Sequence, residues 1–358
     1  MAETQTTKTD LESTVKQILM NIDRPREREV LERRFGLTGT RETLEQVGET
    51  LGITRERVRQ IEKATLIRAK ISLDDGKNAE FNTAEMQLVK ALHELGRAAK
   101  VDVLSEKLLG DSSVKSRAVI TLLAELSSKA IATTENDRYH AAVVLTEDKD
   151  DKKIKSAIDE VVTEVKKHGE PCNADTLFVW LQNAKNANYE HPTEVTAMAS
   201  LSKLISTLNG MWGLSKWPTV NPRNIRDKIY VVLGQNGKPM HFGKIASAVK
   251  AERFRRNNVT EQAIHNELIK DDRFVLVGRG IYALSEWGYE KGSISDVITK
   301  ILKEESPLHR EEIVRRVLKV RQVREATILL NLQNKPQFKR VAKGQYSYAD
   351  ENLAKTSK

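Results

Sequence analysis

The sequence of 358 residues contains a single cysteine, Cys172. One cysteine cannot build a disulfide framework, which indicates a reducing compartment. No apolar run approaches the ~18 residues that a membrane-spanning helix needs. The first ten residues, MAETQTTKTD, are polar and lack the basic-then-apolar order of a secretory signal. We therefore expect a soluble, cytoplasmic protein that has no contact with a membrane.

Patterns that indicate catalysis are also scarce. The seven histidines are scattered, and none stands at metal-ligand spacing to another histidine or to Cys172. A nucleophilic pair of His168 and Cys172 is conceivable, but the residues between them are typical of a loop, so a structural cysteine is favoured. Glycine-containing stretches such as GRG lack Walker spacing. The sequence thus predicts no enzyme activity, no metal, no cofactor and no small-molecule substrate.

Positive charge is in modest excess and is unevenly distributed. The chain carries 59 Lys and Arg against 50 Asp and Glu, a net charge of +9. Residues 24–70 have a net charge of +4, residues 71–221 of −4 and residues 222–349 of +11. A polyanionic partner is therefore expected to meet the two ends of the chain and not its middle.

The stretch TLEQVGETLGITRERVRQIEKATLIRAK has the pattern of two helices joined by a sharp turn. Thr43 and Gln46 have the spacing of a capping box and open the first helix. Gly52 permits the turn, and Thr54 can cap the second helix. Apolar residues recur on the inner side of both helices. This pattern predicts a helix-turn-helix, in which the start of the second helix enters the major groove of DNA.

Charged and polar side chains are concentrated at the start of the second helix. Arginine can read guanine, glutamate can accept from cytosine, and glutamine suits adenine. A solvated helix face is the alternative interpretation, but the position in the turn-linked pair favours DNA contact. The base-contacting candidates are Arg55, Glu56, Arg59 and Gln60. Backbone amides and cations suit phosphate, so the phosphate-contacting candidates are Thr43, Leu44, Arg57 and Lys63.

The stretch from RPREREVLERRFGL through LGITRERVRQIEKATLIRAK, residues 24–70, resembles region 4 of bacterial sigma-70-type factors. The elements RFGL, TLEQVG and LGITRERVRQIE carry this resemblance. It implies that Arg55, Glu56, Arg59 and Gln60 read a −35 promoter element, and that the domain docks on the β flap of RNA polymerase. Only 23 residues precede this stretch, so we expect no region that melts the −10 element and no complete sigma factor.

The remainder of the chain repeats one pattern at a spacing of about 65–70 residues. Each copy reads as three helices, a strand, a tight turn and a second strand, the pattern of a winged helix. GRGIYALSEW, KGQYSY and NGMWGLSKW are its clearest echoes. The predicted fold is mostly α with small β-wings, an N-terminal helix-turn-helix followed by tandem winged-helix domains. The expected parts are a flexible N-terminus or short helix (1–22), the helix-turn-helix (23–72), four winged-helix-like domains (81–146, 153–220, 222–289 and 291–350) and a tail (351–358).

Residues 223–288 further resemble the HARE-type helix-turn-helix domain, a winged helix also found in the δ subunit of RNA polymerase. KPMHF, HNEL and GRGIYAL carry this resemblance. It implies DNA contact or association with polymerase; a solvated basic surface or a docking face for an acidic protein is the alternative. The candidates by charge and position are Arg255, Arg256, Arg273, Arg279, Arg321, Arg324, Lys339, Arg340 and Lys343.

Three functional hypotheses follow. The first is a sequence-specific, DNA-binding transcription regulator that recognises a −35-like element in double-stranded DNA and associates with the RNA polymerase core. The second is an adaptor bound to RNA polymerase, for which DNA contact is secondary. The third is a nucleoid-associated or DNA-modification-linked binding protein.

Overall fold

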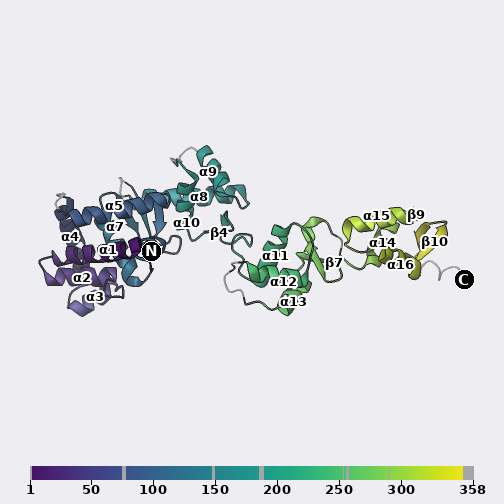
Figure 1. Ribbon diagram of the computed structural model, residues 1–358, viewed down its shortest axis with the longest axis horizontal. Coiled ribbons are helices and arrows are strands. Elements are labelled where there is room, and N and C mark those ends of the chain that lie inside the picture. Colours follow the sequence, from purple (N-terminus) through teal and green to yellow (C-terminus); the bar gives the residue numbers. More distant parts are fainter. Residues whose placement is uncertain are drawn as a thin grey trace. The chain divides into compact units, whose positions relative to one another are not determined.

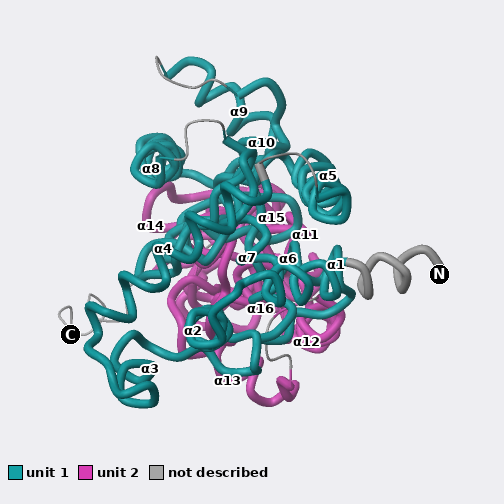
Figure 2. Tube along the Cα trace, turned by 90° about the vertical axis from the view of Figure 1, so that its left-hand side faces the viewer, with its two compact units in different colours: residues 1–216 teal, residues 217–358 magenta. Residues whose placement is uncertain are grey.

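The computed structural model describes residues 2–74, 78–146, 150–184, 189–252, 254, 258–289 and 291–349. As expected, this part of the chain is mostly helical with small antiparallel sheets. It divides into two compact units, residues 1–216 and residues 217–358, shown in teal and magenta in Figure 2. Each unit is described by itself below, with the element labels of Figure 1.

Unit 1 begins with four helices, α1 (Ala2–Met20), α2 (Pro25–Phe35), α3 (Leu44–Leu51) and α4 (Arg55–Asp74). The sequence predicted a flexible start or a short helix before residue 23, whereas α1 takes in 19 residues. Leu11, Val15 and Leu19 recur every four residues on α1 and are buried, so this helix has a continuous apolar stripe to pack.

A three-helix module with a small sheet follows in unit 1. It consists of α5 (Ala79–Glu94), β1 (Ala98–Lys100), α6 (Val101–Leu109), α7 (Val114–Leu126), β2 (Ala130–Thr133) and β3 (Ala142–Leu145). The strands form an antiparallel sheet in the order β1-β3-β2. These elements lie close to the ranges that the sequence predicted for the first winged-helix-like domain.

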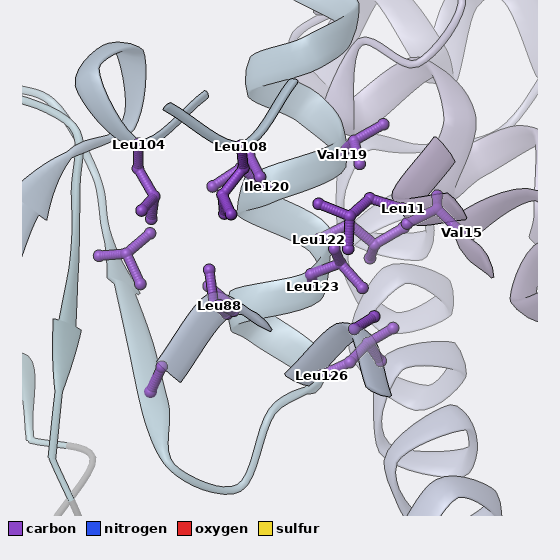
Figure 3. Packing of buried hydrophobic residues seen from close by; sticks show 14 of the residues in the cluster. Leu11, Val15, Leu88, Leu104, Leu108, Val119, Ile120, Leu122, Leu123 and Leu126 are labelled. Atoms are coloured by element: carbon purple, nitrogen blue, oxygen red, sulfur yellow. The ribbon is translucent and has the colours of Figure 1, made fainter. Parts of the chain in front are cut away.

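Helices α1 and α2 and the end of α4 share one hydrophobic core with this module, whereas the α3–α4 turn has a small core of its own. Leu11 and Val15 of α1 lie beside Leu122 and Leu123 of α7 in Figure 3. Leu73, near the end of α4, is buried in the same cluster. The two predicted domains, 23–72 and 81–146, are therefore not separate packing units. Helix α1 belongs to the core that joins them.

A second module completes unit 1, with α8 (Asp151–His168), α9 (Ala174–Asn183), α10 (Pro192–Leu201), β4 (Ile205–Leu208) and β5 (Met211–Leu214). Cys172 is buried just before α9, and its backbone exchanges two hydrogen bonds with Trp212 of 2.9 and 2.7 Å. Burial raises the pKa of the Cys172 thiol to about 11. The His168 ring stacks on Trp180 with a centroid distance of 3.8 Å. This arrangement fits the structural role that the sequence favoured for Cys172.

Unit 2 contains two further modules of the same kind. The first has α11 (Ile225–Asn236), β6 (Met240–His241), α12 (Phe242–Ala251), α13 (Glu261–Lys270), β7 (Phe274–Gly278), β8 (Ile281–Leu284) and a short 3-10 helix, η1 (Ser285–Trp287). The second has α14 (Ile294–Glu304), β9 (Leu308–His309), α15 (Arg310–Val320), α16 (Glu325–Asn334), β10 (Phe338–Ala342) and β11 (Gln345–Tyr348). Their sheets have the equivalent orders β6-β8-β7 and β9-β11-β10.

A proline followed two positions later by His or Asn marks the second helix of three modules. Pro171, Pro239 and Pro307 stand 68 residues apart, and Asn173, His241 and His309 precede α9, α12 and α15. Gly280 and Gly344 in the hairpin turns lie directly against His241 and His309, because an added Cβ would come within 2.8 and 2.6 Å of their Nε2 atoms. Glycine at these hairpin positions therefore permits the close packing of the two histidines, and the positive φ also favours glycine.

Candidate nucleic-acid interface

The helix-turn-helix forms because local signals at both ends of α3 agree. The Thr43 hydroxyl accepts from the backbone N–H of Gln46 (3.3 Å), and the Gln46 side chain accepts from the backbone N–H of Thr43 (2.8 Å). This capping box is the one that the spacing predicted. Helix α3 ends at Gly52 in the left-handed conformation, with φ of 64°, which a glycine adopts without steric cost.

Helix α3 packs very closely against the turn that leads into α4. An added Cβ on Gly48 would stand 2.7 Å from the carbonyl oxygen of Ile53, so this position requires glycine. Behind the turn, Val30, Val47 and Val58 are fully buried together. This small core fixes the angle at which α4 leaves the turn, and thereby the direction of its exposed side chains.

Helix α2 is held against the pair by ion pairs. Arg34 donates from Nε to Glu62 of α4 (3.0 Å) and from Nη1 to the carbonyl oxygen of Glu42 (2.6 Å). Arg68, in the second half of α4, pairs with Glu27 of α2. Several basic residues of α2 and α4 are thus engaged in holding the fold together and are less available to a polyanion.

The four base-contacting candidates, Arg55, Glu56, Arg59 and Gln60, are all exposed on the first two turns of α4. Arg59 forms a two-point ion pair with Glu56, with N···O distances of 2.9 and 2.6 Å. Arg55 pairs with Glu45 of α3 at 2.8 Å. The structure therefore places these side chains together on one surface, where each guanidinium is already matched to a carboxylate.

The Arg59–Glu56 pair shifts the titration of both groups. Hydrogen bonds from Arg59 hold the pKa of Glu56 below its usual range, and the same bonds raise the pKa of Arg59. Both side chains are more than half exposed, so the pair is dynamic and screened by salt, with little value for stability. The pair remains fully charged at neutral pH and can be exchanged for contacts to bases.

The phosphate-contacting candidates differ in their availability. Arg57 and Lys63 are exposed, although Arg57 also donates to the Gln60 side chain at 3.3 Å. The Thr43 hydroxyl is used in the capping box, and the Leu44 side chain packs against the small core. At these two positions only the backbone at the start of α3 is suited to meet a phosphate.

Glu45 is a residue of this surface that the sequence reasoning missed. Its carboxylate neutralises Arg55 across the turn. Ten positions separate the two residues, so neither helical periodicity nor a capping pattern could reveal the pair. The turn geometry alone brings them together.

The candidates in unit 2 fall into two groups. Arg279 and Lys343 lie exposed at the hairpin turns, Lys339 and Arg340 are exposed on β10, and Arg324 is exposed before α16. Arg273 precedes β7 and is held by Asp271 (2.8 Å) and Asp227 (3.2 Å), which leaves it less suited to DNA contact. Arg255 and Arg256 lie outside the described residues.

The prediction for Arg321 as a surface contact is wrong. Its side chain is 5% exposed and donates to the carbonyl oxygen of Leu276 in the preceding module. A guanidinium buried between two modules cannot reach a nucleic acid. Its charge suggested exposure, because no sequence pattern reveals a carbonyl acceptor 45 residues away.

The described residues offer little for two other classes of site, a metal centre and a membrane-spanning helix. No group of three or more His, Cys, Asp or Glu in this part of the chain could hold a metal ion. Within the same residues, no helix combines the length and apolar character needed to cross a membrane.

Comparison with known proteins places this surface in a family context. Residues 24–68 match the family model of sigma-70, region 4. Over 65 residues the chain is 43% identical to the RNA polymerase sigma factor SigA of Nostoc sp., and over 57 residues it is 39% identical to the chloroplastic RNA polymerase sigma factor sigF of Arabidopsis thaliana. These alignments cover 18% and 16% of this chain, and 16% and 10% of the two relatives. No solved structure matches the chain. The resemblance to region 4 expected from the sequence is thereby confirmed for residues 24–68.

Proposed function

We propose that this chain is a sequence-specific, DNA-binding transcription regulator that recognises a −35-like promoter element and associates with RNA polymerase. The observation that carries the proposal is the surface of Arg55, Glu56, Arg59 and Gln60 on the first turns of α4, within the segment that matches sigma-70 region 4. Side chains of these types can make two-point contacts to base edges in the major groove.

The mechanism requires binding and no catalytic step. The start of α4 enters the major groove while Arg57, Lys63 and the backbone at the start of α3 contact phosphates. Arg59 and Glu56 exchange their mutual hydrogen bonds for contacts to bases. Phosphate neutralisation supplies most of the affinity, so binding weakens steeply as salt is raised.

The remaining modules extend this role in the proposal. Their three helices and antiparallel hairpins suit tandem winged-helix domains. We propose in addition that residues 222–289 are a HARE-type or δ-like domain, on the sequence resemblance alone. Exposed Arg279, Arg324 and Lys343 add positive charge to unit 2. These modules lengthen the footprint on nucleoid DNA or contact the polymerase, for which the β flap is the expected docking site of the sigma-like segment.

A direct test is to compare the wild type with an Arg59→Ala, Gln60→Ala double variant. Binding to a labelled duplex with a −35-like element is expected to weaken by at least about tenfold, since each two-point contact is worth about 1–3 kcal/mol. Genome-wide immunoprecipitation should show sharp peaks over that element, lost in the double variant. The matched control is Arg315→Ala, which removes an exposed arginine with the same ion-pair spacing to Glu312 and should leave binding unchanged.

One observation favours the alternative of a polymerase-bound adaptor. Ile67 and Ile71 lie one turn apart on α4 and are 47% and 62% exposed. Exposed apolar residues at this spacing suit contact with another protein better than contact with DNA. In this case the sigma-like segment holds the polymerase and DNA contact is secondary.

Two double variants distinguish the promoter-reading function from the adaptor function. Ile67→Ser with Ile71→Ser should release the chain from purified RNA polymerase core and leave duplex binding intact. If genomic occupancy follows the polymerase, survives Arg59→Ala with Gln60→Ala and disappears in the isoleucine variant, the adaptor role replaces the promoter-reading role.

A further inference from the structure

The two sheets of unit 2 have equivalent strand orders and the same register shift in their hairpins. Leu276 pairs with Tyr282 on β8, and Arg340 pairs with Tyr346 on β11. Immediately after these pairs the register shifts by one residue in both hairpins, so that Val277 and Val341 occupy the same position in equivalent bulges. β7 and β10 are each one of the two outer strands of their sheet. The contacts made at the edge of β7 therefore indicate what kind of segment could bind at the edge of β10.

The edge of β7 is occupied by a segment of the following module. The backbone N–H of Gln322 donates to the carbonyl oxygen of Val277 at 3.0 Å, and the Arg321 guanidinium donates to the carbonyl oxygen of Leu276. An added Cβ on Gly278 would stand 2.6 Å from the carbonyl oxygen of Gln322. The contact is thus one of backbone against backbone, and N–H and guanidinium groups satisfy the carbonyls of the edge.

Within the described residues, no segment is hydrogen-bonded to the equivalent edge of β10. Val341 is 56% exposed, whereas Val277 is fully buried, in part beneath Trp287 and Tyr289 of its own module. Lys339, Arg340 and Lys343 surround Val341 and are exposed. An outer strand with exposed apolar and basic side chains is a template for pairing with another extended chain.

We propose that β10 is a docking site for an extended, acidic segment of a partner protein, which adds a strand at the edge. The carbonyl oxygens at the bulge can accept from the N–H groups of an added strand, as the Val277 carbonyl accepts from the Gln322 N–H on β7. A peptide supplies such donors and DNA phosphates do not. Acidic side chains that flank an apolar residue would match Lys339, Arg340 and Val341. The proposal does not depend on how α4 reads DNA.

The segment that covers β7 does not fit the same edge when it comes from a second copy of this chain. The segment that covers β7 carries Lys319, Arg321 and Arg324 within six residues. Placed on β10 of another copy, it would bring these cations against Lys339, Arg340 and Lys343. Like charges on facing strands are destabilising, so the occupant must have the opposite charge.

The test uses two labelled peptides and the full chain. The first peptide copies residues 318–325, LKVRQVRE, and the second, LEVEQVEE, replaces its basic residues by glutamate. Fluorescence anisotropy should detect binding of the acidic peptide with a Kd below about 1 mM and at least about tenfold weaker binding of the basic one. The triple variant Lys339→Glu, Arg340→Glu, Lys343→Glu should reverse this preference. Its control, Lys238→Glu, Lys244→Glu, Lys270→Glu, changes three other exposed lysines of unit 2 and should not.

The backbone contact has its own readout. An acidic peptide that is N-methylated at its glutamine lacks the N–H equivalent to that of Gln322, and it should bind at least about tenfold more weakly. Equal binding of the methylated peptide, or no binding of the acidic peptide, overturns the proposal. A third outcome also overturns the proposal. If the triple variant binds a nonspecific DNA duplex more weakly than wild type, and both proteins bind the acidic peptide equally, then β10 is a DNA-contacting strand.

Discussion

Arg59 and Glu56 satisfy each other across one turn of α4, with two hydrogen bonds of 2.9 and 2.6 Å on the surface that is proposed to read DNA. The free protein therefore presents a neutral pair where a bound complex would present two separate contacts to bases. Opening this pair costs little because both groups are exposed. In the proposed function, this arrangement would withhold the positive charge of Arg59 from nonspecific DNA until a matching sequence is bound.

Glu56→Gln removes the carboxylate that neutralises Arg59. We expect binding to a nonspecific duplex to strengthen and its dependence on salt to steepen by about one counterion, because one more cation meets the phosphates. Titrations at several salt concentrations measure this slope. Glu94→Gln, which removes the carboxylate paired with Lys107 in the α5–α7 module, serves as the control and should leave the slope unchanged. Equal slopes for all three proteins would contradict the proposed role of the Arg59–Glu56 pair.

Gly48→Ala should damage the turn between α3 and α4. The new methyl group would stand 2.7 Å from the carbonyl oxygen of Ile53, so the helices must separate, at a cost of about 1–3 kcal/mol. Hydrogen exchange of the α3 and α4 amides should accelerate, and duplex binding should weaken. Gly234→Ala on α11 meets nothing within 4 Å and should leave exchange in unit 1 unchanged. Unchanged protection in Gly48→Ala would mean that the turn tolerates the methyl group.

Leu11→Ala tests the shared core of unit 1. Leu11 is 1% exposed and packs in the cluster that contains α7 and the end of α4. The substitution should lower the free energy of unfolding by about 2–5 kcal/mol, with faster hydrogen exchange in α7 as well as in α1. Met20→Ala, at a position 57% exposed on the same helix, should change stability by less than about 0.5 kcal/mol. Normal protection of α7 in Leu11→Ala would show that α1 is dispensable to this core.

The Cys172 thiol should be almost inert in the native protein. Its pKa of about 11 leaves very little thiolate near neutral pH, and the side chain is buried. Reaction with a disulfide reagent should be at least about a hundredfold slower than in the chain unfolded by guanidinium chloride, and it should accelerate as pH rises toward 11. A native rate close to that of the unfolded chain would contradict the structural role of this cysteine.

Local features of this fold could be predicted from the sequence, and long-range ones could not. The capping box of Thr43 and the turn at Gly52 depend on residues within four positions, so spacing was sufficient. The role of α1 depends on α7, about a hundred residues further along the chain. Arg273 and Arg321 were interpreted as surface cations because charge alone does not reveal a distant Asp227 or a backbone carbonyl of β7.

Helix α4 is a single element of 20 residues whose two ends have different roles. Its first turns carry Arg55 and Arg59, while Leu73 near its far end is anchored in the core of unit 1. At about 1.5 Å per residue the helix extends for roughly 30 Å. As one continuous helix, it fixes the position of its first turns relative to the core of unit 1. If the first turns of α4 bind a promoter element, the orientation of that element would therefore determine on which side of the DNA the α5–α7 module lies.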